Sequence, residues 1–183
     1  MRKLLLAIAF ITSLFVVTPA YSGEVKFQYD YINGNHNGQQ LKAEYNDTLF
    51  WIVSYGMELN TKQNFDDKKV GSQIVAKTGL KLGFFGTTIA PRVEIGHAFK
   101  ALDSGEFYGG ELRVTSPTGF DPVSVTVGGR YRKGINVNNM KTVRTEFTTE
   151  YKLNSSSRIG VSYYHTMFDD TDNSVGIFYR VKF

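Results

Sequence analysis

The residues best suited to do chemistry in this sequence are charged side chains that recur two positions apart. Acidic and basic members alternate in this way in the pairs Lys42/Glu44, Arg92/Glu94, Glu111/Arg113 and Arg144/Glu146. In an extended strand, residues i and i+2 point to the same side. These charges must be paired or hydrated, because an unpaired charge in a closed site costs several kcal/mol. The spacing therefore predicts one strongly charged face built from several strands.

Basic residues outnumber acidic ones on this face. Its basic members are Lys26, Lys42, Lys77, Lys81, Arg92, Arg113, Arg130, Arg132, Arg144, Lys152, Arg158, Arg180 and Lys182. Its acidic members are Asp30, Glu44, Glu58, Glu94, Glu111, Glu146 and Glu150.

Two interpretations of this face stay open. If it encloses water, rings of Arg and Lys predict a pore that prefers anions. If its charges pair with one another, it predicts a salt-bridged filling that stabilises a narrow barrel. Arg130 and Arg132 have no acidic neighbour on their own strand, which favours the pore. The residues expected to line an anion path are Lys77, Lys81, Arg92, Arg113, Arg130, Arg132, Arg144, Arg180 and Lys182.

The elements that must position these charges are strands, because polar and apolar residues alternate along most of the chain. Ten such segments are predicted: Glu24–Ile32, Gln39–Tyr45, Thr48–Leu59, Ser72–Leu82, Thr87–Phe99, Glu106–Thr115, Val123–Arg132, Lys141–Leu153, Arg158–Phe168 and Ser174–Phe183. Pro91 weakens the fifth locally, since proline cannot donate to the ladder. Connections after odd strands look longer than those after even strands, such as the short turn at Asn46-Asp47. An even strand number with loops of alternating length is typical of bacterial outer-membrane barrels.

The first 22 residues have the features of a secretory signal peptide. A basic start at Arg2-Lys3 precedes an apolar run, and Ala20 and Ser22 supply a cleavage-site pattern. Residues 23–183 are then expected to form a single transmembrane domain. The absence of cysteine excludes a disulfide framework and a thiol nucleophile. The net charge of +4 includes Arg2 and Lys3, so it is too weak to indicate nucleic acid.

The apolar face decides between two kinds of barrel. A soluble secreted barrel would turn this face inward, whereas an outer-membrane barrel turns it towards lipid. Aromatic residues stand near both ends of the predicted strands, as interfacial girdles do. The expected girdle residues are Tyr45, Trp51, Tyr151 and Phe183 at one end and Tyr31, Phe99, Tyr108 and Tyr131 at the other. Glycines recur on the charged face, and such small residues suit a narrow lumen.

The last strand, Ile177–Phe183, ends the chain on an aromatic residue with apolar residues at alternate positions before it. In this strand the sequence resembles Gram-negative outer-membrane β-barrel proteins. The resemblance implies an all-β, antiparallel, up-and-down transmembrane barrel of about ten strands in the outer membrane. It also implies contact with outer-membrane lipid and lipopolysaccharide, and recognition of the last strand by the barrel-assembly machinery. The Arg130-Tyr131-Arg132 segment and the Tyr179-Arg180-Val181 ending resemble the oligogalacturonate-specific porins, whose substrates are acidic oligosaccharides.

The function expected from these patterns is that of a small, monomeric porin-like channel for small anionic solutes, without a cofactor or metal. The alternative is a non-conducting structural or adhesion barrel that acts through its loops. An outer-membrane enzyme ranks third. Its candidate groups are His36, His97, His165, Asp66, Asp67, Asp103, Asp169, Asp170 and Asp172. His97 and His165 fall on the apolar face by parity, and no His-x-Ser motif occurs in the sequence.

Overall fold

The computed structural model describes residues 23–35, 37–66, 68–99, 104–136, 140–168 and 171–183. The predicted signal peptide, residues 1–22, and His36, Asp67, Asp103, Asp169 and Asp170 lie outside the described residues. The strands are β1 Glu24–Gly34, β2 Gly38–Leu49, β3 Val53–Asn64, β4 Val70–Leu80, β5 Leu82–Phe84, β6 Thr87–Phe99, β7 Gly105–Pro117, β8 Val123–Gly134, β9 Lys141–Lys152, β10 Ser157–Phe168 and β11 Asp172–Lys182.

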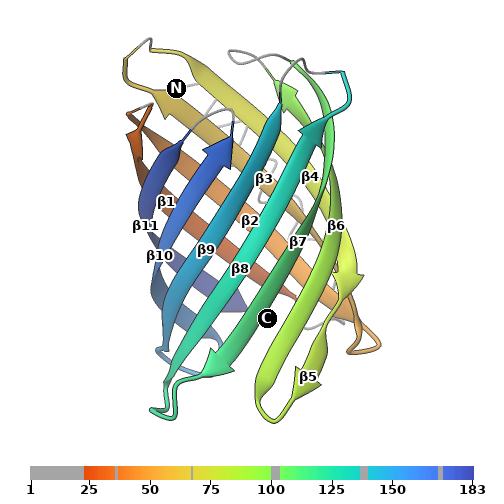
Figure 1. The fold of residues 1–183 in the computed structure, drawn as a ribbon. Coiled ribbons are helices and arrows are strands. Elements are labelled where there is room, and N and C mark those ends of the chain that lie inside the picture. Colours follow the sequence, from red (N-terminus) through yellow and green to blue (C-terminus); the bar gives the residue numbers. More distant parts are fainter. Residues whose placement is uncertain (1–22, 36, 67, 100–103, 137–139, 169–170) are drawn as a thin grey trace.

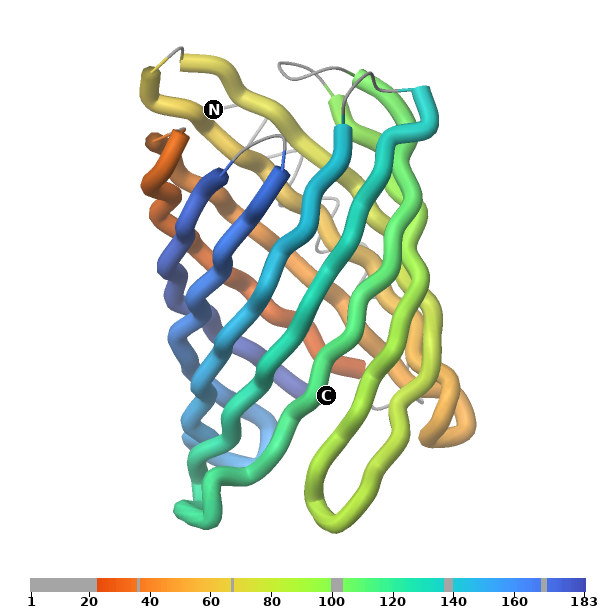
Figure 2. The backbone as a smooth tube through the Cα atoms, viewed as in Figure 1, coloured from red at the N-terminus to blue at the C-terminus, as the bar shows by residue number. Residues whose placement is uncertain are grey.

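The strands close into one barrel, in which each long strand pairs antiparallel with its neighbours in the sequence (Figure 1). Pairing of β4 with β6 and of β1 with β11 completes the ring. The tube view shows the strands steeply tilted around the barrel axis (Figure 2). The prediction of an up-and-down antiparallel barrel with ten long strands is confirmed, and β5 is a short additional strand. Closure leaves every long strand with two partners, as backbone groups in lipid require.

The turn between β2 and β3 lies further along the chain than the sequence predicted. Asp47 and Thr48 still pair with β3, so the expected turn at Asn46-Asp47 is wrong and the turn falls at 50–52. Phe50 and Trp51 form it with positive φ values of 51° and 63°. Asp47 stays in the ladder because its carboxylate accepts hydrogen bonds from the hydroxyls of Tyr45 (3.1 Å) and Tyr55 (2.8 Å). Bulky residues rarely adopt this backbone conformation, so turn propensity favoured Asn46-Asp47 over Phe50-Trp51.

Pro91 accounts for the division of the predicted fourth strand into β4 and β5. The pairing of β4 with β6 ends at Gly79 and Arg92, and the pairing of β5 with β6 starts at Leu82 and Ile89. Pro91 lies in the interruption, because it has no N–H to give to the ladder. On the side away from β6, pairing with the β3 side of the sheet continues, since the backbone N–H of Lys81 donates to the carbonyl of Ile52, at 2.7 Å. The predicted local weakening at Pro91 is therefore present in the structure.

The connections differ less in length than the sequence predicted. The ladder of β1 and β2 continues to Ile32 and Gly38, and that of β2 and β3 continues to Asn64. Polar residues at these strand ends keep their backbone pairing even where neither face needs to be apolar. We call the edge that holds the β2–β3, β5–β6, β7–β8 and β9–β10 turns the turn rim, and the opposite edge the loop rim. Gly23 and Phe183 lie together at the turn rim, where the Phe183 N–H donates to the Gly23 carbonyl (3.1 Å).

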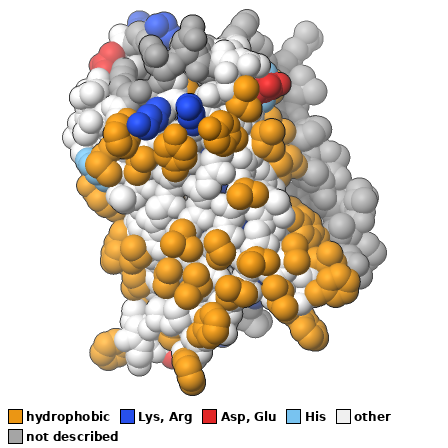
Figure 3. All heavy atoms as spheres, turned by 45° about the vertical axis from the view of Figure 1, so that its right-hand side comes forward, with side chains coloured by type: hydrophobic (Ala, Val, Ile, Leu, Met, Phe, Trp, Pro, Cys, Tyr) orange, Lys and Arg blue, Asp and Glu red, His pale blue; other side chains and the backbone are white. Residues whose placement is uncertain are grey.

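The outer surface of the barrel is apolar. Phe27, Val93, Ile95, Val127 and Ile177 are among its exposed side chains. In the view of Figure 3, hydrophobic side chains cover the barrel wall, and charged side chains gather mostly near one rim. The opposite parity on each strand is buried and largely charged, the reverse of a soluble barrel. No helix in the described part of the chain is long and apolar enough to span a membrane.

Candidate functional site

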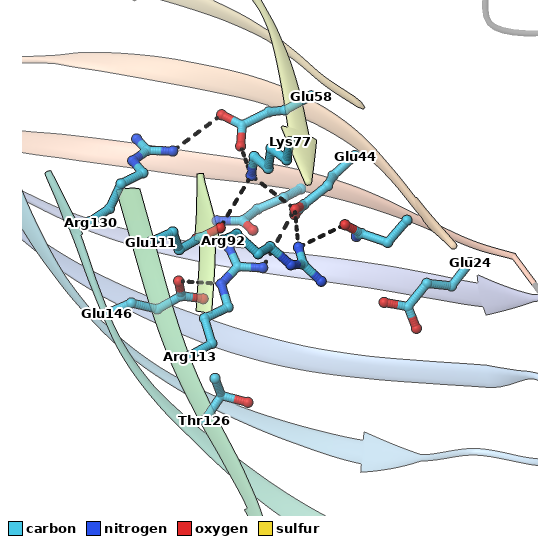
Figure 4. A network of polar contacts seen from close by, with 12 residues as sticks. Glu24, Glu44, Glu58, Lys77, Arg92, Glu111, Arg113, Thr126, Arg130 and Glu146 are labelled. Atoms are coloured by element: carbon cyan, nitrogen blue, oxygen red, sulfur yellow. Dashed lines mark hydrogen bonds and ion pairs between the residues drawn. The ribbon is translucent and has the colours of Figure 1, made fainter. Parts of the chain in front are cut away.

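The centre of the barrel interior holds a cluster of ion pairs around Lys77 on β4 (Figure 4). The Lys77 Nζ lies 3.0 Å from Glu44 Oε1, 2.6 Å from Glu58 Oε2 and 3.6 Å from Glu111 Oε2. All four side chains are almost completely buried. One ammonium therefore holds together carboxylates from β2, β3 and β7. We call Lys77, these three carboxylates and their Arg partners the central network.

Arginines extend the central network from one wall of the barrel to the other. Arg113 on β7 contacts Glu111 (2.9 Å), Glu146 on β9 (3.1 Å) and Glu44 on β2 (3.4 Å). Strands β7 and β2 are separated by β6, β4 and β3 along the shorter way around the ring. Arg92 on β6 adds a hydrogen bond to Asn46 Oδ1 (2.8 Å) and an ion pair with Glu44 (3.7 Å). The Arg113–Glu44 contact thus crosses the lumen.

Arg130 and Arg132, which the sequence presented as unpaired, are both paired. Arg132 directs its Nε and Nη2 at the two carboxylate oxygens of Glu94, at 2.5 and 3.0 Å. Arg130 reaches Glu58 at 3.4 Å, and these two residues come from β8 and β3, on nearly opposite walls. The expectation that they lack partners is wrong, because their partners lie on other strands and no same-strand spacing can show them. This part of the interior is closed by ion pairs.

A second group of charges lies nearer the turn rim. Glu150 on β9 accepts from Arg158 and lies 3.4 Å from Arg180, which is also 3.7 Å from Glu24. Lys81 and Lys182 are exposed at this rim, because they stand at the ends of their strands. The other seven residues expected to line the interior point inwards.

Three inward-facing cations have no acidic partner. Lys26, Lys42 and Arg144 are only 2%, 4% and 7% exposed. Among the described residues, no carboxylate forms an ion pair with any of them. They contact aromatic rings instead: Lys26 lies 4.1 Å from the centroid of Phe178, while Lys42 and Arg144 lie 4.7 and 4.3 Å from that of Tyr164. Lys26 and Lys42 were part of the predicted charged face but not among the residues expected to line an anion path.

Glycines on the inner face make room for these rings. A Cβ on Gly160 would collide with the ring of its cross-strand partner Phe178, and one on Gly96 with the ring of Phe107. The sequence showed the glycines but not the rings they accommodate. Strand parity places Tyr164, Phe107 and Phe178 inside the barrel. Their contacts with cations can be seen only in the folded structure.

The expected girdle residues lie on the outer side. Tyr31, Phe99, Tyr108 and Tyr131 stand towards the loop rim, and Tyr45, Tyr151 and Phe183 towards the turn rim. Trp51 differs, since it lies in the β2–β3 turn and is 88% exposed rather than part of a strand. Phe85 and Phe120 occupy similar exposed positions in neighbouring turns.

The histidines described by the structure lie away from the charged interior. His97 packs against Phe99, with ring centroids 4.6 Å apart, and His165 Nδ1 is 2.8 Å from Asn173 Oδ1. In the described ranges, no group of three or more His, Asp or Glu side chains is arranged to hold a metal ion.

Comparison with solved structures places this arrangement among outer-membrane barrels. The translocator domain of the autotransporter NalP from Neisseria meningitidis is 10% identical, with a TM-score of 0.53, 100% of this chain covered and 96% of that one. The NanC porin is 12% identical, with a TM-score of 0.52, 87% of this chain covered and all of that one. The chain has the fold of the outer-membrane β-barrels. At these identities the likeness shows the fold alone, and the resemblance noted in the last strand is confirmed at that level.

A KdgM porin in complex with disordered oligogalacturonate is also similar, at 14% identity and a TM-score of 0.48, with 85% of this chain and 98% of that chain covered. One longer neighbour is matched over only 61% of its own length. No protein-family model and no curated protein matches the sequence.

Proposed function

We propose that this chain is a monomeric outer-membrane barrel that lets small anions pass through a narrow lumen. The observation that carries the proposal is the set of three buried cations, Lys26, Lys42 and Arg144, which have no acidic partner within the part of the chain that the structure describes. Interior side chains that served only to stabilise the barrel would have balanced charges, because an uncompensated buried charge is strongly unfavourable. Cations left unbalanced in a lumen attract anions and repel cations.

The central network limits what such a lumen can pass. The ion pairs Arg113–Glu44 and Arg130–Glu58 join nearly opposite walls, so the path is narrow and runs beside them. We expect conductance well below that of barrels with more strands, whose lumens are water-filled. The outer-membrane location, contact with lipopolysaccharide and recognition of the last strand by the assembly machinery belong to the same proposal. Their support is the apolar outer wall and the fold.

A second function is favoured by the same cross-lumen ion pairs. If they never open, the barrel is a non-conducting structural or adhesion protein that acts through its loop rim. The central network then serves to stabilise the wall, as interiors of small barrels are often filled by side chains.

Planar bilayer recordings of the folded protein separate these functions. We expect small discrete channels whose reversal potential in a salt gradient favours anions. Replacing both Lys42 and Lys26 by Gln should weaken this preference, whereas Arg158→Gln, at the turn rim, should leave it unchanged. Absence of channels would support the non-conducting barrel. A reversal potential that favours cations would refute the anion preference.

A further inference from the structure

Tyr164 on β10 is the centre of a second cluster inside the barrel, outside the central network. Its ring contacts both Lys42 of β2 and Arg144 of β9, and only 1% of the residue is exposed. Its hydroxyl forms a hydrogen bond with the Gln28 amide of β1, 2.9 Å from Nε2. The ring is thus held in place by four strands, and two cations that repel one another lie against it.

Arg144 has donors that no protein group uses. Its Nε and Nη2 are buried and have no hydrogen-bond partner among the described residues. Its cross-strand neighbour on β8 is Arg130, another cation, and the acidic partner of Arg130 is Glu58. A contact with an aromatic ring compensates only part of the cost of burying a guanidinium. The charge of Arg144 is therefore left for a group that the described residues do not supply.

The identity of the free atoms specifies the kind of group. Nε–H and the adjacent Nη2–H lie on one edge of the guanidinium and point in parallel. This edge matches two oxygens of a carboxylate or a phosphate, which can accept one hydrogen bond each in a paired geometry. The ammonium of Lys42 is repelled by the cations Arg144 and Arg130 and attracted by the carboxylates of Asp30 and Glu58. Asp30 already receives the Gln28 amide through Oδ1.

We propose that Arg144 and Lys42, arranged against Tyr164, form an internal binding site for one carboxylate or phosphate group. Arg144 supplies the two-donor edge, Lys42 supplies a second positive charge, and Gln28 fixes the ring that positions both. The proposal deepens the function above by giving a permeating anion a specific binding site. It does not depend on conduction, because binding can be measured on the folded barrel itself.

The test is a titration of the folded barrel in detergent micelles with sodium phosphate and with sodium acetate. Sodium chloride keeps the ionic strength constant, and binding is followed by calorimetry and by the midpoint of thermal unfolding. We expect saturable binding of phosphate, acetate or both, with a rise in the midpoint that chloride does not produce. Binding of one but not the other identifies which two-oxygen anion the site takes.

Variants assign the binding to Arg144. Arg144→Lys keeps the charge but loses the paired donors, and we expect affinity to fall about tenfold or more. Arg144→Gln should abolish binding without lowering the midpoint measured in chloride, since it removes an unpaired buried charge. Arg158→Gln is the matched control and should bind like the original protein.

Several outcomes would overturn the site. They are equal responses to chloride and phosphate, no saturable binding, or unchanged affinity in Arg144→Lys. Failure here is distinguishable from failure of the proposed function. Binding without channels would leave the site in place and remove the channel, whereas anion-selective channels without binding would do the reverse.

Discussion

Replacement of Lys77 by Met is the sharpest test of the central network. The change keeps an unbranched, flexible side chain, one atom shorter, but withdraws the ammonium from Glu44, Glu58 and Glu111. Breaking a buried ion pair by removing one partner costs about 3–5 kcal/mol. The remaining contacts of the carboxylates, such as Arg113 with Glu44 at 3.4 Å and Arg130 with Glu58 at 3.4 Å, place the expected loss at the lower end, about 3 kcal/mol.

The measurement is the free energy of unfolding in urea, for the protein folded into lipid vesicles. Trp51 is the single tryptophan and reports unfolding by its fluorescence. Adding Glu58→Gln to Lys77→Met should recover part of the loss, because the double change removes one carboxylate together with one ammonium and so restores the charge balance of the network. Lys133→Met, at an exposed position, is the control and should change stability by less than about 0.5 kcal/mol. If Lys77→Met were as mild as this control, the charges would be hydrated and the network would not close the lumen.

Three further changes probe other parts of the barrel. Arg132→Lys should destabilise it by about 1–3 kcal/mol in the same urea assay, because lysine cannot make both contacts with Glu94; full stability would contradict the paired geometry. Gly176→Ala places a Cβ against Asp30 and the Tyr29 carbonyl and should cost about 1–3 kcal/mol, whereas Gly129→Ala, with open space around it, should cost little. Ile177→Arg, in the middle of β11 on the outer wall, should cost about 2–4 kcal/mol in vesicles, and Ile135→Arg, beyond the end of β8, less than about 1 kcal/mol; equal costs would argue that the wall does not face lipid.

The sequence was sufficient to predict the fold because strand parity is a local property. Alternation in segments such as Thr87–Phe99 gave the bounds of β6 and the side on which Arg92 and Glu94 lie. It failed at Phe50-Trp51, where two bulky residues form the turn and Asp47 is retained in the ladder by two tyrosine hydroxyls. That arrangement depends on a partner eight residues away, and turn propensity does not contain it.

The ion pairs across the lumen could not be predicted from the sequence, for a different reason. The separation of Arg130 from Glu58, or of Arg113 from Glu44, has no period, since it depends on strand order, tilt and register together. Parity showed that Arg144 faces inwards, but the same parity holds for Arg132, which is fully paired. The two differ in their neighbours in the closed ring, because Arg132 lies beside Glu94 and Arg144 lies against the ring of Tyr164. These neighbours are set by the tertiary structure.

The seam between β1 and β11 also governs how this barrel can form. Every other junction of long strands joins neighbours in the sequence, so those hairpins can develop one after another. The seam pairs Glu24 with Lys182 and Gly34 with Asp172, so closing it requires nearly the whole chain to be brought end to end. Until then β1 and β11 are edge strands with unpaired backbone groups, open to pairing with other chains. Folding is therefore expected to be slow and to end in one late step, and a chain that lacked β11 would leave two edges rather than a smaller barrel.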